Sequence, residues 1–431
     1  MNIFVAILHG ISYGRHTLLP GAIALLVAGT PAAADIFAAA PERRVDQFPT
    51  DSGYLLVPLP YSMPGIGEGY FLMGYFSNIF DTTADAFIVK VEGDAEGLVA
   101  QADEIPLYKQ HLLLNLYDQR IDKAAVNNYK TRGMTNGQDA YNIVEVNQAD
   151  EQHIGLTLSL FDRRGEYSLQ HQQSAAAATA LRDSSGKLIA TLDPPYQQES
   201  SSWHHTLRLD FTDDYLDPRR GVRYELRYQD VPGESSNDPD YYRLDNSLSL
   251  YLPFFKHDTL ALNYYQSDAH VTRIGNVDPD AIRAELNAGC DPADTACLQA
   301  EQELVDSFIL QRTNGTATTL GGNDRLRGYP QGRFNGGHMA FIGAEYRWNF
   351  VRDAKPFNFF IWKDVTTAMQ LALFVETGTV AETAGALWHE RRTTYGLGGR
   401  LLTASGSVYR ADLAFSDEGQ EAILFFHYPW K

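Results

Sequence analysis

The stretch VRYELRY, residues 222–228, alternates strictly between two kinds of side chain. One face of an extended chain would carry the apolar and aromatic members, Val222, Tyr224, Leu226 and Tyr228. The opposite face would carry only charges, Arg223, Glu225 and Arg227. Alternation with a period of two predicts a β-strand whose two faces meet different surroundings.

The same alternation recurs in HTLRLDF (205–211), RLDNSLSLYL (243–252), AFIGAEYRWNF (340–350) and YRADLAF (409–415). The polar faces combine arginine with aspartate or glutamate, and the apolar faces end in tyrosine, tryptophan or phenylalanine. An apolar outer band with aromatic girdles around a polar lumen is typical of a transmembrane β-barrel. A closed barrel also removes the sheet edges that lipid cannot satisfy. The fold class predicted is therefore an all-β, antiparallel transmembrane barrel.

Short and long connections should alternate around such a barrel, with the short ones in the periplasm. Short links occur at FDTT, PLYKQ, FDRRG, DYLDPRRG, PFFKHD and TASGS, and long segments at roughly 120–140, 174–200, 269–337 and 379–392. This pattern gives about sixteen strands between Gly53 and Trp430, an even number as bacterial barrels require. We expect residues 52–431 to form the barrel, with 35–51 as a short periplasmic segment and 269–337 as the longest extracellular loop.

The first 34 residues have the parts of a secretory signal. Arg15 is followed by an apolar run and by PAAAD, which predicts residues 1–34 as a signal peptide cleaved after Ala34. The formal net charge of −19 becomes −20 without Arg15, which argues against a nucleic-acid partner. The expected location is the outer membrane of a Gram-negative bacterium, in contact with its lipids.

The longest loop contains DPDAIRAELNAGCDPADTACLQAEQELVDSFI, which has helical spacing. We expect a short extracellular helical insert here, with Asp278 or Asp280 as its cap. Cys290 and Cys297 are the two cysteines of an exported chain, which favours a disulfide that braces this local turn. No histidine or third cysteine lies near them, so neither a metal site nor a cofactor is predicted.

Five segments follow one another along the second half of the chain: LGGNDRLRGYPQGRF (320–334), GAEYRW (343–348), LALFVETG (371–378), GLGGRLL (396–402) and YRADLAFS (409–416). In this order they resemble the bacterial surface antigen (D15) family, the barrels of BamA, TamA and two-partner-secretion type. DYLDPRRGVRYEL (214–226) resembles the Pro-x-x-Gly turn of that family. Only about seventeen residues precede the barrel, so the chain is similar to members that lack periplasmic POTRA domains.

The resemblance implies that the sixth extracellular loop folds back into the lumen. Arg327, Gly328 and Tyr329 match the Arg-Gly-aromatic motif of that loop, and Glu376 and Glu345 match the wall acids that meet the arginine. Both acids also fall on polar strand faces, where a charge requires a partner, and an arginine fork can satisfy a carboxylate. Gly321 and Gly322 would let the loop turn sharply toward the wall. We expect Arg327 to latch the loop inside.

Two functions remain open from the sequence. The family resemblance implies assistance in outer-membrane protein or lipid assembly or translocation, with a periplasmic partner or outer-membrane protein substrates. The alternative is a passive or gated pore plugged by its re-entrant loop. An enzyme is not expected, because the sequence has no Gly-x-Ser-x-Gly elbow and no His-Glu-x-x-His zinc helix. His204 and His205 would also point to opposite faces of a strand.

Overall fold

The computed structural model describes residues 47–255, 258–286, 293, 295–351, 357–359, 362–365, 367–403 and 408–430. The first half of the sheet consists of β1 (Gly53–Met63), β2 (Gly67–Ser77), β3 (Asp85–Gly93), β4 (Glu96–Tyr108), β5 (Leu112–Tyr129), β6 (Tyr141–Leu160), β7 (Gly165–Asp183), β8 (Leu188–Asp210) and β9 (Gly221–Val231). The second half consists of β10 (Asp240–Phe254), β11 (Asp258–Arg273), β12 (His338–Val351), β13 (Phe357–Phe359), β14 (Trp362–Val365), β15 (Thr367–Ala381), β16 (Arg392–Thr403), β17 (Val408–Ser416) and β18 (Gly419–Phe426). Short 3-10 turns, η1 (Ile79–Asp81) and η2 (Ala384–Ala386), lie in two connections.

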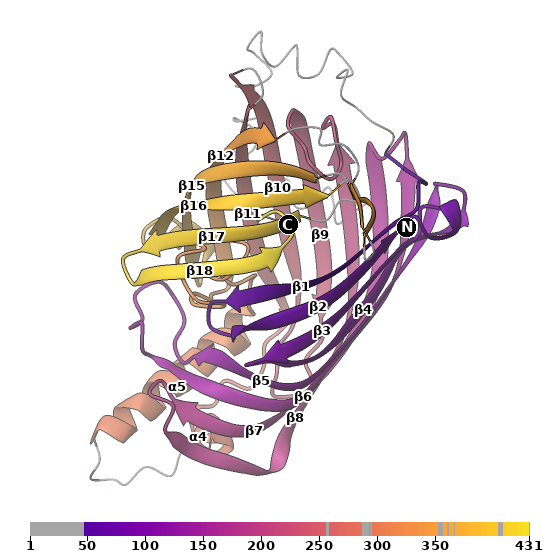
Figure 1. The fold of residues 1–431 in the computed structure, drawn as a ribbon. Helices are drawn as coiled ribbons and strands as arrows, with labels where there is room; N and C mark the ends of the chain where they lie inside the picture. The colour runs from indigo at the N-terminus through magenta and orange to yellow at the C-terminus, as the bar shows by residue number, and fades with distance from the viewer. Residues whose placement is uncertain are drawn as a thin grey trace.

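In the described part of the chain, sixteen strands form the wall of the barrel (Figure 1); they are β1 to β12 and β15 to β18. Each of them pairs antiparallel with the next wall strand in the sequence. The wall closes where β18 meets β1. This arrangement confirms the predicted all-β barrel and its strand number. The short strands β13 and β14 form a hairpin between β12 and β15, and β14 pairs with the beginning of β1.

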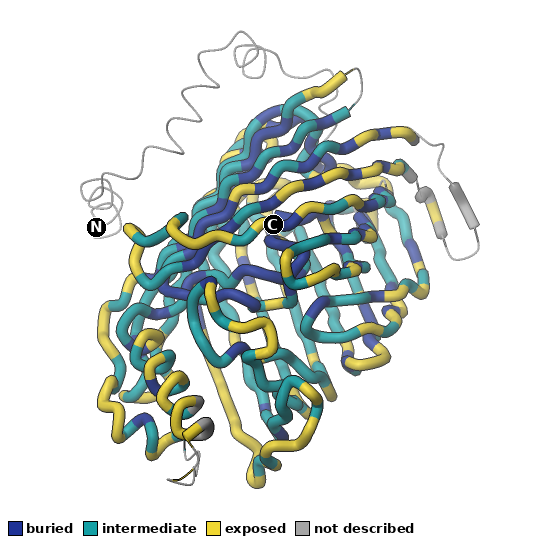
Figure 2. Tube along the Cα trace, turned by 90° about the vertical axis from the view of Figure 1, so that its left-hand side faces the viewer, coloured by how far each residue is buried: buried dark blue, intermediate teal, exposed yellow. Residues whose placement is uncertain are grey.

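The two faces of each strand differ as the alternation predicted. On β15, Leu373 and Val375 point outward and are 59% and 49% exposed. Phe374 and Glu376 alternate with them, point inward and are 4% and 0% exposed. Buried and exposed positions alternate along the wall strands in the same way (Figure 2). The inward arginines find carboxylates on neighbouring strands; Arg208 Nη2 of β8, for example, lies 2.8 Å from Glu225 Oε2 of β9.

Three expected connections differ from the structure. β5 continues to Tyr129, so the expected segment 120–140 is a connection only over 130–140. Residues 174–200 are not a long loop; they form the outer halves of β7 and β8, which are joined by a short turn at 184–187. Their alanines, serines and glutamines give no two-faced alternation, and backbone pairing continues there without such a pattern. β11 also continues to Arg273, so the longest loop begins five residues later than the expected position 269.

That loop contains two helices, α4 (Pro279–Leu286) and α5 (Thr295–Asn314), in agreement with the predicted helical insert. Arg312 joins them, because its Nη2 lies 2.8 Å from Glu285 Oε2. Among the described residues, neither these helices nor any other has the length and apolar character needed to cross a membrane. Cys290 and the predicted signal peptide 1–34 lie outside the described residues, as does the side chain of Cys297, so the disulfide stays a prediction.

Candidate functional site: the loop inside the barrel

Residues 320–337 return from helices α4 and α5 into the lumen. Leu320 and Phe334 form an antiparallel bridge at the neck of this segment, and both side chains are fully buried. The backbone at Gly321 and Gly322 has φ of +103° at each, the left-handed region that favours glycine. A side chain at Gly321 would place its Cβ 2.1 Å from the Pro330 carbonyl oxygen. The two glycines therefore permit the tight reversal that brings residues 325–329 to the wall.

Gly328 lets the loop touch the wall. A Cβ at this position would lie 2.4 Å from Thr394 Oγ1 and 3.0 Å from the backbone of Phe415. The Gly328 carbonyl also accepts a hydrogen bond of 2.7 Å from Ser416 Oγ on β17. Because no side chain fits between loop and wall, only glycine allows the neighbouring arginine to reach its partners.

Arg327 is fully buried and contacts three carboxylates from three wall strands. Its Nε donates to Glu376 Oε1 at 2.8 Å, its Nη1 to Asp412 Oδ2 at 2.8 Å and its Nη2 to Glu345 Oε2 at 3.1 Å. The backbone N–H of Arg327 donates to the other oxygen of Glu376 at 2.9 Å. The guanidinium carbon lies 3.5 Å from the centre of the Phe374 ring. Charge-assisted hydrogen bonds of this length are among the strongest in proteins.

Three further buried arginines complete this group, which we call the Arg327 cluster; its members are Arg327, Arg347, Arg400, Arg410, Glu345, Glu376 and Asp412. Arg347 Nε donates to Glu345 at 2.8 Å, and Arg400 Nη2 donates to the same carboxylate at 3.0 Å. Arg410 Nη1 donates to Asp412 at 2.9 Å. Four guanidinium groups and three carboxylates leave a formal excess of one positive charge. Removing one member would leave a buried charge without its partner, which is strongly unfavourable.

The C-terminal residues also enter the lumen. β18 ends at Phe426, so the expected final strand to Trp430 is four residues too long. His427 and Trp430 have positive φ, and the chain between them leaves the sheet. Trp430 Nε1 donates to Glu376 at 2.9 Å, while the Tyr428 hydroxyl donates to Asp217 at 2.7 Å. Asp217 lies in the turn between β8 and β9, so the C-terminal tail connects that turn with the Arg327 cluster.

The end of the lumen nearer α4 and α5 is covered by residues from several connections. The Tyr329 hydroxyl donates to Asp417 in the turn between β17 and β18, and Arg392 pairs with the same carboxylate. Partial burial would raise the pKa of Asp417, but these two donors and their charge hold it below its ordinary value. Met134, from the connection between β5 and β6, packs with the buried loop residues. This cover lies directly outside the Arg327 cluster.

At the opposite end of the lumen, the buried Arg163 connects several segments. The Arg163 guanidinium lies between two aromatic rings, with its carbon 4.3 Å from the Phe48 centroid and 4.4 Å from the Tyr215 centroid. Its Nε donates to the Gln47 carbonyl at 2.9 Å, and Arg163 is only 4% exposed. Cation–π contacts of a desolvated arginine are favourable by about 2 kcal/mol. They attach the segment before β1 to the turn between β8 and β9.

β1 and β18 have far fewer paired residues than β1 and β2 or β17 and β18 have. β1 pairs with β2 from Gly53 to Met63, and β17 pairs with β18 from Tyr409 to Ser416. Within the described residues of β1 and β18, the register contains one pair, Ser62 opposite Leu424. We call this contact the seam.

Two prolines explain the weak pairing. The Pro60 carbonyl accepts a hydrogen bond of 2.7 Å from the Tyr409 hydroxyl of β17, so the polar backbone side of Pro60 faces the seam and not β2. The backbone of Pro58 has the same orientation, because residues two apart in a strand point their backbone groups to the same side. Proline has no N–H to donate and is confined to strand edges. β1 is therefore an edge strand by its sequence.

The structure brings together Arg327, Glu376 and Glu345, as the sequence predicted, and adds residues that the prediction did not include. Asp412, Arg347, Arg400 and Arg410 all lie on polar strand faces, so the alternation placed them in the lumen without indicating which would meet Arg327. No pattern in the sequence predicted that Trp430 would enter the lumen. Pro58 and Pro60 within an otherwise strand-like segment were a readable sign of an edge. Among the described residues there is no group of three or more histidine, cysteine, aspartate or glutamate side chains arranged to hold a metal ion.

No family model matches this sequence, and no curated protein matches it. Among solved structures, the chain is similar to BamA from Haemophilus ducreyi lacking POTRA domains 1-3, with 12% identity, a TM-score of 0.46, and coverage of 88% of this chain and 69% of that chain. It is also similar to CdiB from Escherichia coli, with 11% identity, a TM-score of 0.46, and coverage of 87% of this chain and 61% of that chain. The assignment of a barrel comes from the strand pairing of this chain itself.

Proposed function

We propose that this chain is an outer-membrane barrel that assists the assembly or translocation of outer-membrane proteins or lipids. The membrane location is supported by the outward face of the wall, where large apolar side chains such as Leu373, Leu397 and Tyr395 are at least half exposed. A soluble protein rarely exposes an apolar surface of that extent. The inward face carries the buried ion pairs instead.

The observation that carries the proposed activity is the seam. Unpaired backbone N–H and C=O groups in hydrocarbon cost several kcal/mol each, so a poorly paired edge in a membrane wall is under pressure to acquire a partner. An exposed sheet edge can bind an extended segment by adding it as a strand. β1 offers such an edge beside β18, where Ser62 alone opposes Leu424 among the described residues, and β2 holds it firmly on the other side. A seam of this kind can admit a substrate strand or acyl chain laterally.

The Arg327 cluster has a supporting role in this proposal. Because Arg327 joins three wall strands through one loop residue, it fixes the part of the wall that borders β18. Trp430 extends this connection to the tail that follows β18. We infer that the loop acts as a latch, which keeps the lumen filled and the wall rigid while the seam opens.

The test closes the seam with a disulfide. Cysteines at Ser62 and Leu424 would stand opposite each other across it. The matched control is Leu413→Cys with Ala422→Cys, an opposed pair across β17 and β18, which are already fully paired. In a strain that lacks the wild-type protein, the oxidised seam pair should reduce the amounts of outer-membrane proteins or alter outer-leaflet lipids, and reduction should restore them. The oxidised control pair should have no such effect.

An unchanged outer-membrane proteome and lipid composition in the deletion strain would refute the assembly role. If ion conductance in planar bilayers then rose on removal of Arg327, the barrel would instead be a plugged pore. The fully buried loop residues Tyr329 and Phe334 fill the lumen, so a pore requires displacement of the loop.

A further inference from the structure

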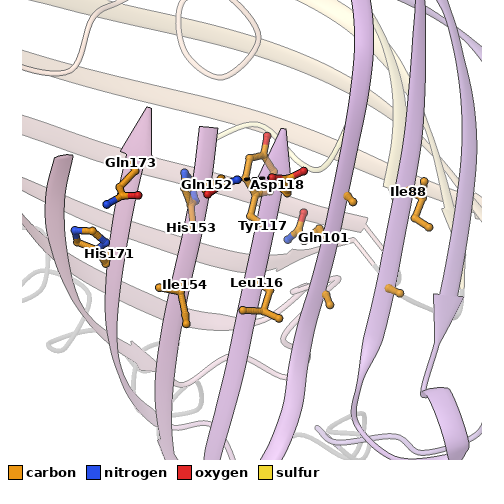
Figure 3. A pocket seen from close by; sticks show the side chains of 13 residues that line it. Ile88, Gln101, Leu116, Tyr117, Asp118, Gln152, His153, Ile154, His171 and Gln173 are labelled. Atoms are coloured by element: carbon orange, nitrogen blue, oxygen red, sulfur yellow. Dashed lines mark hydrogen bonds between the residues drawn. The ribbon is translucent and has the colours of Figure 1, made fainter. Parts of the chain in front are cut away.

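A groove of about 500 Å³ lies on the outward face of the barrel across β3, β4, β5, β6 and β7 (Figure 3). Ten of its thirteen lining residues form two adjacent rows that run across the strands, and Gln101, Tyr117 and His153 lie between these rows in the sequence. One row runs from Ala86 through Leu116 to His171, and the other from Ile88 through Asp118 to Gln173. Ile88 is 46% exposed and its neighbour Val89 is 3% exposed, which places the rows on the outer face.

The hollow results from three alanines. Ala86, Ala100 and Ala102 stand side by side on β3 and β4 and line one end of the groove. Their methyl groups leave the space that a leucine or valine would fill at an ordinary outward position. The groove has the size of many small-ligand sites, and its alanine end offers only apolar atoms.

The other end of the groove is polar, and the change occurs at the same level on three strands. Reading outward positions from the periplasmic end, β5 has Leu112, Leu114 and Leu116, followed by Asp118 and Arg120. β6 has Leu158, Leu156 and Ile154, followed by Gln152 and Asp150. β7 has Tyr167 and Leu169, followed by His171 and Gln173. An apolar band that gives way to polar side chains marks the boundary between hydrocarbon and headgroups.

The groove is inclined to the membrane. Its first row meets β3 at the second residue of the strand, Ala86, and meets β7 at the seventh, His171. The alanine end therefore lies nearer the periplasm, inside the hydrocarbon, and the His171 end lies nearer the outside. A lipid with its acyl chain at the alanines would have its headgroup beside Asp118, Gln152 and His171.

The polar end has a particular charge arrangement. Asp118 Oδ1 accepts a hydrogen bond of 2.8 Å from Gln152 Nε2, drawn as the dashed line in Figure 3. Asp118 Oδ2 lies 3.1 Å from Arg120 Nε, whose side chain is 65% exposed. A carboxylate next to a guanidinium complements a headgroup in which an ammonium group stands next to a phosphate. A purely anionic headgroup would instead meet the Asp118 charge.

We propose that this groove binds one phospholipid with a phosphoethanolamine headgroup, with the ammonium at Asp118, the phosphate at Arg120 and an acyl chain over the three alanines. The inference rests on the membrane location proposed above but is independent of the seam. The site would hold a lipid against the part of the wall formed by β3 to β7.

The test counts lipids retained by the detergent-purified full chain in native mass spectrometry. The probes are palmitoyl-oleoyl phosphatidylethanolamine and the phosphatidylglycerol with identical chains. Wild type should retain one phosphatidylethanolamine, with about a tenfold preference corresponding to one charge-assisted hydrogen bond. Ala100→Phe fills the groove and should abolish retention of either lipid. Asp118→Asn should remove the preference.

Glu92→Gln is the matched control, because Glu92 is also an exposed outer-face carboxylate in an ion pair, with Lys90 at 3.5 Å, and does not line the groove. It should behave as wild type. Heat-modifiable migration in gels shows that each variant is folded, and fractionation with the outer membrane tests the location separately. The proposal would be overturned if wild type retained both lipids equally or if Ala100→Phe retained lipid as wild type does. It would also be overturned if the chain formed a dimer without lipid, because a second copy would then cover the groove.

Discussion

Trp430 donates its indole hydrogen to Oε1 of Glu376 at 2.9 Å, and the same oxygen accepts from the loop arginine at 2.8 Å. The C-terminal tail and the extracellular loop thus share one carboxylate on β15. Neither segment is adjacent to the other in sequence. Glu376 therefore couples the chain that follows the seam to the loop that fills the lumen.

Arg327→Ala should lower the free energy of unfolding by about 3–5 kcal/mol, because it leaves three buried carboxylates without this partner. Urea unfolding of the refolded barrel in lipid vesicles, followed by heat-modifiable migration, measures the change. Arg327→Lys should be intermediate, since it keeps the charge but loses the planar fork. Arg283→Ala, which removes an arginine exposed on α4, is the control. Equal stability of Arg327→Ala and wild type would contradict the latch.

Trp430→Phe should destabilise the barrel by about 1.5–3 kcal/mol, the usual loss for a hydrogen bond to a charged group. The effect should shrink in an Arg327→Ala background, because both residues act on Glu376 and neighbouring effects are not additive. Trp348→Phe, at an outward tryptophan that is 49% exposed, should change stability little. Strictly additive effects of the Trp430 and Arg327 substitutions would show that the tail and the loop are uncoupled.

Gly328→Ala should displace the loop, since the added methyl would lie 2.4 Å from Thr394 Oγ1 and close to the Phe415 backbone. Overpacking of this kind typically costs about 1–3 kcal/mol. Faster proteolysis of the 320–337 segment in intact vesicles would report the displacement. Gly385→Ala, where a methyl group meets nothing within 4 Å, should leave the cleavage rate unchanged.

The contact of Asp417 with Tyr329 and Arg392 should make stability depend on pH. The pKa of Asp417 is lower in the folded state than in the unfolded state, so the ionised carboxylate favours folding at neutral pH. This contribution is present above the unfolded pKa of about 3.9 and is lost as the pH falls through the lower folded value. Asp417→Asn should therefore be less stable than wild type at pH 7, and the two unfolding curves should converge in acid. A difference that stayed constant over that range would assign the effect to something other than ionisation.

The sequence by itself determined the class of fold and the contents of its two faces. Strict alternation in strands such as 222–228 separates side chains for lipid from side chains for the lumen, because consecutive residues of a strand point in opposite directions. The glycines at 321, 322 and 328 also predicted a loop that turns sharply. Pro58 and Pro60 carried a signal for the edge, since a residue without an N–H cannot serve a fully paired strand.

Alternation alone does not decide which charges meet: the family resemblance implied Glu345 and Glu376 as partners of Arg327, and only the tertiary structure added Asp412. Alternation places Glu345, Glu376 and Asp412 on the inner face, yet these residues are far apart in sequence and converge because barrel closure and register bring their strands together around Arg327. The entry of Trp430 into the lumen and the single residue pair of the seam have the same origin. The outward groove likewise needs β3 and β4 in register before its three alanines become neighbours. Local pattern fixes the direction of each side chain, whereas its partners depend on the long-range pairing of the closed sheet.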